Sequence, residues 1–472
     1  MPSYHAASPN ADEFISHAEI TDTLRCAQSV KQDTALVDAI LEKAREAKGL
    51  SHREASVLLA CEDPAKVGEI INLAFEIKQQ FYGNRIVLFA PLYLSNYCIN
   101  GCLYCPYHYT SDIPRTKLSQ DEIRAETIAL QNMGHKRLAR EAGEDPVNNP
   151  IEYILESLDT IYSVKHKNGA IRRVNVNIAA TTVENSRKLR DAGIGTYILF
   201  QETYDKAGYE HLHPRGPKSN YAYHTEAMDR AMRGDIDDVG LGVLFGLENY
   251  AYEFAGLLMH AEHLEAVFGV GPHTISVPRV KPAHGVDPGS FAGGISDALF
   301  EKIAACIRIA VPYTGMIVST RESKSVRERL LRVGVSQVSG ASRTSVGGYG
   351  NQSGEEDTRQ FEVQDTRSLD EVIRWLIDAG YVPSFCTACY RAGRTGDRFM
   401  ALCKSKQILN CCHPNALVTL KEYLVDYAAP QTREAGERLI EKEIGVIPRE
   451  SVREWVRTNL VNIENGQRDF RL

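Results

Sequence analysis

The pattern of apolar and polar positions changes near residue 85. Before it, residues 33–48, 51–61 and 64–80 carry apolar side chains at helical spacing, which predicts a helical segment over residues 1–80. After it, short apolar runs alternate with amphipathic stretches of helical length, the pattern of repeated βα units around a parallel sheet. The predicted strands cover residues 85–91, 137–142, 173–179, 196–201, 238–245, 273–280, 314–319 and 336–340.

Amphipathic stretches between these strands predict the intervening helices, and the whole pattern predicts a complete (β/α)8 barrel of the TIM type. The active site of such a barrel lies at the C-terminal ends of its strands. A glycine-rich stretch over residues 346–350 marks the end of the barrel. We therefore expect an α/β protein with an N-terminal helical segment (1–80), a barrel (81–345) and a C-terminal helical domain (346–472).

The composition is that of a soluble globular protein, with 43% hydrophobic and 24% charged residues. A net charge of −7 argues against nucleic acid as a partner, because phosphate binding needs clustered lysine and arginine. No apolar run is long enough to span a membrane, and the first residues lack the features of a secretory signal. Eleven cysteines, several in short-spaced clusters, indicate metal binding in a reducing compartment, so we expect a cytoplasmic protein.

Three cysteines follow the first predicted strand at the spacing Cys-x₃-Cys-x₂-Cys, namely Cys98, Cys102 and Cys105. A cubane iron–sulfur cluster normally takes four cysteines, so three ligands leave one iron with an open coordination position. A zinc knuckle with His108 as its fourth ligand is the alternative. With Tyr104 before the last cysteine, the motif resembles the signature of the radical S-adenosylmethionine (SAM) superfamily.

The resemblance implies a [4Fe–4S] cluster that binds SAM, with further SAM contacts at other strand ends. Gly143 and Glu144, after the second strand, are similar to the superfamily's Gly-Gly-Glu motif, although a plain turn is the alternative. Residues expected at SAM or the substrate are Tyr104, Asn177, Gln201 and Glu202.

A second group of cysteines lies near the far end of the chain. Cys386 and Cys389 form a CxxC motif, and Cys412 follows after 22 intervening residues. This spacing indicates a second iron–sulfur cluster or a zinc site, in which Cys403 is a possible fourth ligand.

The two cysteine groups together are similar to the HydG family, the tyrosine lyase maturases of [FeFe]-hydrogenase. Further similar strings cover residues 201–204, 213–218, 271–279, 319–322 and 340–345. The resemblance implies a radical SAM carbon–carbon lyase that cleaves L-tyrosine to p-cresol and dehydroglycine, and then makes carbon monoxide and cyanide on iron. It also implies that the second [4Fe–4S] cluster carries a labile fifth iron and a free cysteine, and that the partners are other hydrogenase maturation proteins and an electron donor.

Binding the carboxylate of tyrosine requires a cation, and arginine fits best because its planar fork matches two oxygens. Arg321, after the seventh strand, is the first candidate, together with Ser319, and Arg279 is the second. An arginine that caps or pairs with a helix start is the alternative for Arg321. For the labile iron, His263 and His273 are both candidates, because both are expected near the N-terminal mouth of the barrel.

These placements predict SAM at one mouth of the barrel, the second cluster at the other, and passage of dehydroglycine through the interior. A solid apolar core between the two clusters would contradict that hypothesis. Two alternative functions stay open: a tyrosine lyase for thiamine thiazole synthesis, and an iron–sulfur carrier without turnover. The second cysteine group argues against the first, and a binding site for an amino acid argues against the second.

Overall fold

A closed parallel barrel forms the centre of the computed structural model, which describes residues 3–291, 293–350, 358–405 and 408–472. The sheet closes because β10 pairs with β1 in parallel, with Leu88 opposite Val338. The barrel strands are β1 (Arg85–Ser95), β2 (Arg137–Ala142), β5 (Arg173–Asn177), β6 (Tyr197–Ile198), β7 (Val239–Gly242), β8 (Thr274–Ser276), β9 (Gly315–Val318) and β10 (Gln337–Ser339). Each lies within a predicted strand or extends one, so the predicted (β/α)8 fold is confirmed.

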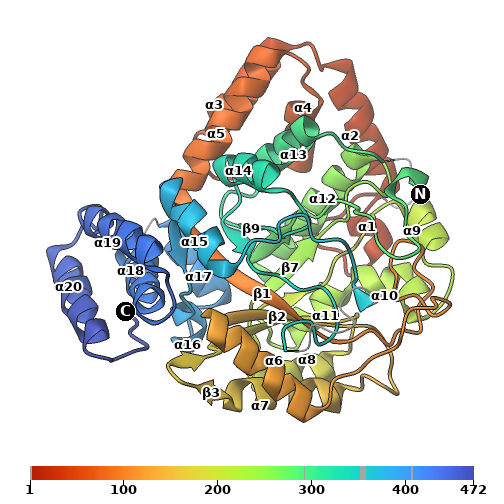
Figure 1. The fold of residues 1–472 in the computed structure, drawn as a ribbon. Helices are drawn as coiled ribbons and strands as arrows, with labels where there is room; N and C mark the ends of the chain where they lie inside the picture. Colours follow the sequence, from red (N-terminus) through yellow and green to blue (C-terminus); the bar gives the residue numbers. More distant parts are fainter. Residues whose placement is uncertain (1–2, 292, 351–357, 406–407) are drawn as a thin grey trace.

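Helices surround the barrel and bury their apolar faces against its strands (Figure 1). They include α6 (Gln120–Met133), α7 (Ile151–Ser163), α8 (Val183–Asp191), α11 (Ala227–Arg233), α12 (Tyr250–Phe268), α13 (Asp297–Ala310) and α14 (Lys324–Val333). The local sequence sets their ends: α6 begins with a capping box between Ser119 and Glu122, and Gly134 ends it in the left-handed conformation. Shorter elements in the connections are β3 (Lys165–His166), β4 (Gly169–Ala170), α9 (Lys206–Leu212) and α10 (Tyr221–Thr225).

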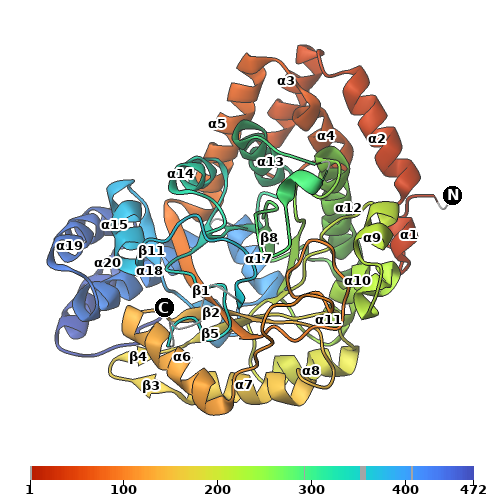
Figure 2. The same cartoon turned by 45° about the vertical axis from the view of Figure 1, so that its right-hand side comes forward.

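Residues 11–82 form five helices, as predicted for the N-terminal segment, and pack on the outside of the barrel. They form α1 (Ala11–Phe14), α2 (His17–Ser29), α3 (Thr34–Ala44), α4 (His52–Ala60) and α5 (Pro64–Tyr82). Helix α5 lies against α13, and α4 lies against α12 and α13. Figures 1 and 2 show these red and orange helices on one side of the barrel and the blue C-terminal helices on another.

A ninth strand, β11 (Val382–Ser384), was not predicted. It pairs in parallel with the first residues of β1, where Arg85 lies opposite Val382. Three residues are too short to show an alternating pattern, and Pro383 argues against a strand in the sequence. The pairing matters because it brings the following CxxC segment to the N-terminal ends of the barrel strands.

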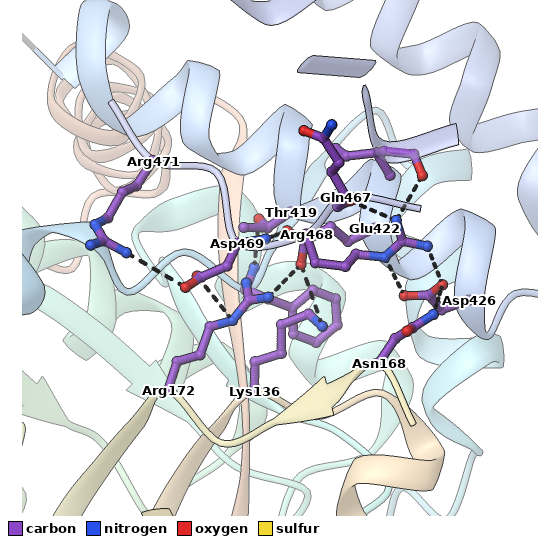
Figure 3. A network of polar contacts seen from close by, with 12 residues as sticks. Lys136, Asn168, Arg172, Thr419, Glu422, Asp426, Gln467, Arg468, Asp469 and Arg471 are labelled. Atoms are coloured by element: carbon purple, nitrogen blue, oxygen red, sulfur yellow. Dashed lines mark hydrogen bonds and ion pairs between the residues drawn. The ribbon is translucent and has the colours of Figure 1, made fainter. Parts of the chain in front are cut away.

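The C-terminal helices are α15 (Leu369–Asp378), α16 (Ala388–Arg391), α17 (Gly396–Lys404), α18 (Ile408–Asp426), α19 (Pro430–Ile444) and α20 (Glu450–Glu464). A buried polar network fastens them to the barrel (Figure 3). Glu422 of α18 lies 2.8 Å from Arg172 and 3.5 Å from Lys136, two cations at the starts of β5 and β2. Asp469, in the segment after α20, contacts Arg172 at 3.2 Å. Among the described helices, none is long and apolar enough to cross a membrane.

Candidate active sites at the two ends of the barrel

A cavity of about 250 Å³ opens at the C-terminal ends of the strands. The three cysteines of the first motif line it, on the loop that follows β1. Residues from the ends of β2 and β9 complete it on other sides, among them Glu141 and Arg321. The barrel therefore brings the first cysteine motif and the expected carboxylate-binding arginine to one cavity.

Backbone hydrogen bonds hold the cysteine loop against two neighbouring segments. The N–H of Ile99 donates to the carbonyl of Glu144 at 2.9 Å, and the N–H of Gly101 donates to the carbonyl of Arg215 at 2.9 Å. A Cβ atom at Gly143 would overlap the carbonyl oxygen of Tyr97. Only glycine therefore allows the segment after β2 to approach the cysteine loop this closely.

The thiols of this loop would have to lose their protons to bind a metal. Burial raises the pKa of Cys102 and of Cys105 to about 12, so both are protonated at neutral pH without a metal. The described residues contain no three His, Cys, Asp or Glu side chains placed to hold a single metal ion. A single shared ion is the arrangement that the zinc knuckle would require.

Most residues predicted to contact SAM line this cavity, namely Tyr104, Gly143, Glu144, Asn177 and Glu202. The Tyr104 hydroxyl lies 2.7 Å from Nε2 of His213, and Glu202 forms an ion pair with Lys218 at 2.9 Å. Glu202 also has a φ of 69°, a left-handed conformation that is uncommon for a residue other than glycine. Such backbone strain is concentrated at functional sites.

Two predicted contacts are not in the cavity. The side chain of Gln201 donates to the hydroxyl of Thr225 at 2.9 Å instead. Arg279 forms a buried ion pair with Glu322, in which its Nε donates to Oε1 at 2.9 Å. Arg279 also contacts Asp297 at 2.9 Å, so its charge is already neutralised within the protein. The structure therefore corrects both expectations.

Arg321 is placed differently from Arg279. Its guanidinium lies 3.5 Å from the ring centroid of Phe361 and, within the described ranges, has no hydrogen bond or ion pair. Burial lowers its pKa, although Tyr93 and nearby acidic groups oppose this. The backbone N–H of Arg321 donates to Ser319 Oγ at 3.3 Å, and both residues line the first cavity. A cation in this setting is a suitable partner for a bound carboxylate.

Glu141, on β2, is a cavity residue that the sequence did not single out. Burial raises its pKa to about 8, while Arg321 and Arg140 oppose this shift, and Asn177 donates a hydrogen bond to its carboxylate. Titratable groups with such shifted pKa values are concentrated at functional sites. Its place at the end of a buried strand is the sequence signal that could have found it.

A second, smaller cavity of about 50 Å³ lies at the N-terminal ends of the strands. Cys386 and Cys389 reach it from the segment between β11 and α16, and Cys412 reaches it from α18. The sulfur of Cys411 lies 3.8 Å from that of Cys412, but Cys411 does not line the cavity. Hydrogen bonds from Cys389 and Cys411 lower the pKa of Cys412 well below its usual value. The side chain of Cys403 lies outside the described residues.

The two candidate histidines have different surroundings. His273 lines the second cavity; its Nε2 lies 3.0 Å from the Tyr390 hydroxyl and its Nδ1 lies 3.2 Å from Asp238. His263 instead stacks on Phe14, and its two ring nitrogens contact the Ala6 carbonyl at 2.6 Å and Asp229 at 3.1 Å. The expectation that His263 reaches the second cysteine group is therefore corrected, because α1 and α11 enclose its ring.

Two arginines in the second cavity were also missed, Arg85 and Arg137. Each is the first residue of a barrel strand, and their exposed fractions are 6% and 5%. Burial opposes the charge of Arg85, but Cys412, Cys386 and Cys389 outweigh it and raise its pKa. For Arg85, a charged residue that opens an otherwise apolar strand is the signal that could have found it. Arg137 opens a strand that also holds Arg140 and Glu141, so it has no such signal.

The two cavities lie close together inside the barrel. On each of four strands, one residue lines the first cavity, and the residue two positions before it in the sequence lines the second cavity. The first set is Phe89, Ala139, Ile317 and Ser339, and the second is Val87, Arg137, Gly315 and Gln337. Two residues along a parallel strand span about 6.6 Å.

Known proteins are similar to this chain in sequence and fold. Residues 92–257 match the model of the radical SAM superfamily, which implies a [4Fe–4S] cluster and SAM, and residues 276–382 match the biotin and thiamin synthesis associated domain. A crystal structure of HydG, a maturase of [FeFe]-hydrogenase, is 53% identical with a TM-score of 0.94 and covers 97% of this chain and 100% of that one. HydG from Carboxydothermus hydrogenoformans is 38% identical with a TM-score of 0.83, covering 95% and 99%. The 2-iminoacetate synthase of Salmonella typhimurium is 29% identical over 347 residues, which are 73% of this chain and 89% of that protein.

Proposed function

Because this chain belongs to the HydG family of [FeFe]-hydrogenase maturases and is a radical SAM enzyme, we propose that it is a tyrosine lyase. It cleaves the Cα–Cβ bond of L-tyrosine to p-cresol and dehydroglycine. It then converts dehydroglycine to carbon monoxide and cyanide on iron, for assembly of the hydrogenase active site. Its partners are other hydrogenase maturation proteins and a reducing electron donor.

The observation that carries this proposal is the presence of two cysteine-lined cavities at opposite ends of one barrel. A thiazole-synthesis lyase has no evident use for the second cavity. A carrier has no evident use for Arg321, a half-buried cation on the wall of the first cavity without a described anionic partner. The 2-iminoacetate synthase relative supports the lyase step, because 2-iminoacetate is another name for dehydroglycine.

In the first cavity, Cys98, Cys102 and Cys105 would hold the cluster that binds SAM. When bound, cluster and SAM supply the radical that removes hydrogen from the substrate. Arg321 and Ser319 hold the carboxylate of tyrosine and so fix its amino group relative to the cysteine loop. Gly143 and Glu144 support that loop from the side of β2.

In the second cavity, Cys386, Cys389 and Cys412 would hold the second cluster, and His273 would hold the additional iron on which the products assemble. Asp238 lies at Nδ1 of His273, and Nε2 lies 3.0 Å from the Tyr390 hydroxyl, a contact that a metal at Nε2 would replace. Dehydroglycine reaches this cavity through the barrel. The short step of about 6.6 Å between the two sets of lining residues supports that route.

The test is an anaerobic reaction of the iron- and sulfide-reconstituted protein with L-tyrosine, SAM and a strong reductant. The proposal predicts p-cresol, cyanide and carbon monoxide, and loss of all three in Cys98→Ala. A protein that cleaves SAM but never releases p-cresol would contradict the proposal. Cyanide from Cys98→Ala would contradict the assignment of the first cavity.

A further inference from the structure

The second cavity is lined by two buried arginines whose hydrogen-bond donors the described protein groups do not fully use. Arg85 is buried, and no hydrogen bond or ion pair joins its guanidinium to another described residue. Its Nε is a buried donor without an acceptor, and so is Nε of Arg137. Arg137 gives one hydrogen bond, from Nη2 to the Tyr390 hydroxyl at 2.9 Å. Both side chains line the cavity beside the three cysteines.

Buried guanidinium groups are costly unless an anion and hydrogen-bond acceptors accompany them. The cysteines supply part of that negative charge, as the raised pKa of Arg85 indicates. The core of an oxidised [4Fe–4S] cluster carries about two positive charges, however. With three cysteine thiolates, the cluster would therefore carry about one net negative charge. The nearby carboxylate of Asp238 contacts His273 and accepts from the N–H of Gly396 through Oδ1, and its Oδ2 has no hydrogen-bond partner among the described residues. The Nε donors of Arg85 and Arg137 are still left without an acceptor.

We propose that Arg85 and Arg137 form a carboxylate subsite in the second cavity, which holds a small α-amino or α-imino acid beside the second metal centre. This inference rests on the proposed function, because dehydroglycine and a free cysteine both carry an α-carboxylate. The planar forks of two arginines match the two oxygens of such a group. Tyr390 connects the subsite to the metal ligand, since its hydroxyl contacts both Arg137 and Nε2 of His273.

Glycine is the probe for this subsite, because it has the same carboxylate and no side chain. Equilibrium dialysis of the anaerobically reconstituted full chain would measure radiolabelled glycine, with L-tyrosine at saturation to fill the first cavity and without SAM. Glycinamide, which lacks the carboxylate, is the competitor control. The variants are Arg85→Met, Arg137→Met and Arg85→Lys, and the iron and sulfide content of each is measured on the same sample.

Lys78→Met is the matched control variant. Lys78 is also a buried basic side chain whose Nζ has no described hydrogen-bond partner, and burial lowers its pKa to about 7, but it lies on α5 and lines neither cavity. We expect wild type and Lys78→Met to bind glycine equally and glycinamide to compete poorly. We expect Arg85→Met and Arg137→Met to bind at least tenfold more weakly with unchanged iron content. Arg85→Lys, which keeps the charge but loses the fork, should lie between them.

Three results would overturn the inference: glycine binding by the methionine variants equal to wild type, equal competition by glycinamide, or loss of the second centre's iron in the arginine variants. The last would assign the arginines to the cluster alone. Iron content also separates this inference from the proposed function. A wild-type protein that takes up iron for only one cluster would contradict the proposed function. The dependence of glycine binding on Arg85 is a separate measurement, and it tests the carboxylate subsite alone.

Discussion

Replacement of Arg321 by methionine tests the tyrosine-binding site in the first cavity. The side chain ends 3.5 Å from the Phe361 ring and has no anionic partner among the described residues, so its loss leaves no carboxylate of the protein unpaired. The effect should therefore fall on the substrate. A hydrogen bond to a charged group contributes about 1.5–3 kcal/mol, and a bidentate carboxylate uses two. The expected loss of about 3–6 kcal/mol corresponds to at least a hundredfold in kcat/KM for tyrosine.

The assay is p-cresol release over a range of tyrosine concentrations under anaerobic conditions. Arg321→Lys keeps the charge but loses the fork, so we expect a loss of about tenfold, roughly one charged hydrogen bond. Arg215→Met is the control, because Arg215 is exposed, lies 4.4 Å from the Tyr109 ring and does not line the cavity. Equal iron content in all variants excludes a general defect. A KM for tyrosine in Arg321→Met within threefold of wild type would refute the reasoning.

Three further predictions concern contacts that support the C-terminal helices, the first cysteine loop and the N-terminal helices. Glu422→Gln removes the charge between two buried cations and should destabilise the C-terminal helices by about 3–5 kcal/mol, seen as a lower unfolding midpoint by circular dichroism; an unchanged midpoint would contradict the network's role. Gly143→Ala should lower the iron bound by the first cysteine motif, because the new Cβ pushes the cysteine loop away; wild-type iron content would contradict this. His52, the first residue of α4, lies between Glu19 at 2.9 Å and Glu262 at 2.8 Å. Burial lowers the pKa of His52, but these two glutamates outweigh burial and raise the pKa above 6.5. His52→Gln should therefore cost most stability below about pH 6.5 and progressively less as pH rises through the folded pKa, measured by urea unfolding, and a cost that grows with pH would refute it.

Local patterns in the sequence predicted the barrel and both cysteine groups. The eight barrel strands have clear apolar runs, and the cysteines that line each cavity are close in sequence, apart from Cys412. Strand β11 could not be predicted, because only its pairing with β1 makes three residues and a proline into a strand.

The residues that depend on three-dimensional neighbours were predicted less well. Arg279 follows a barrel strand, as Arg321 does, but a glutamate far along the chain neutralises it. His263 and His273 are ten residues apart, and only the packing of α1 and of the CxxC segment distinguishes their surroundings. Glu141, Arg85 and Arg137 were missed because a polar residue in a buried strand shows its role only once the barrel is closed.

The most direct test of the account is the product analysis of Cys386→Ala in the anaerobic reaction with L-tyrosine and SAM. Cys386 lines the second cavity and does not line the first, where the other cysteine motif lies. If the two cavities perform successive steps, the variant should still release p-cresol and should produce neither carbon monoxide nor cyanide. Formation of both diatomic products by Cys386→Ala, at the wild-type ratio to p-cresol, would contradict the assignment of the second step to the second cavity.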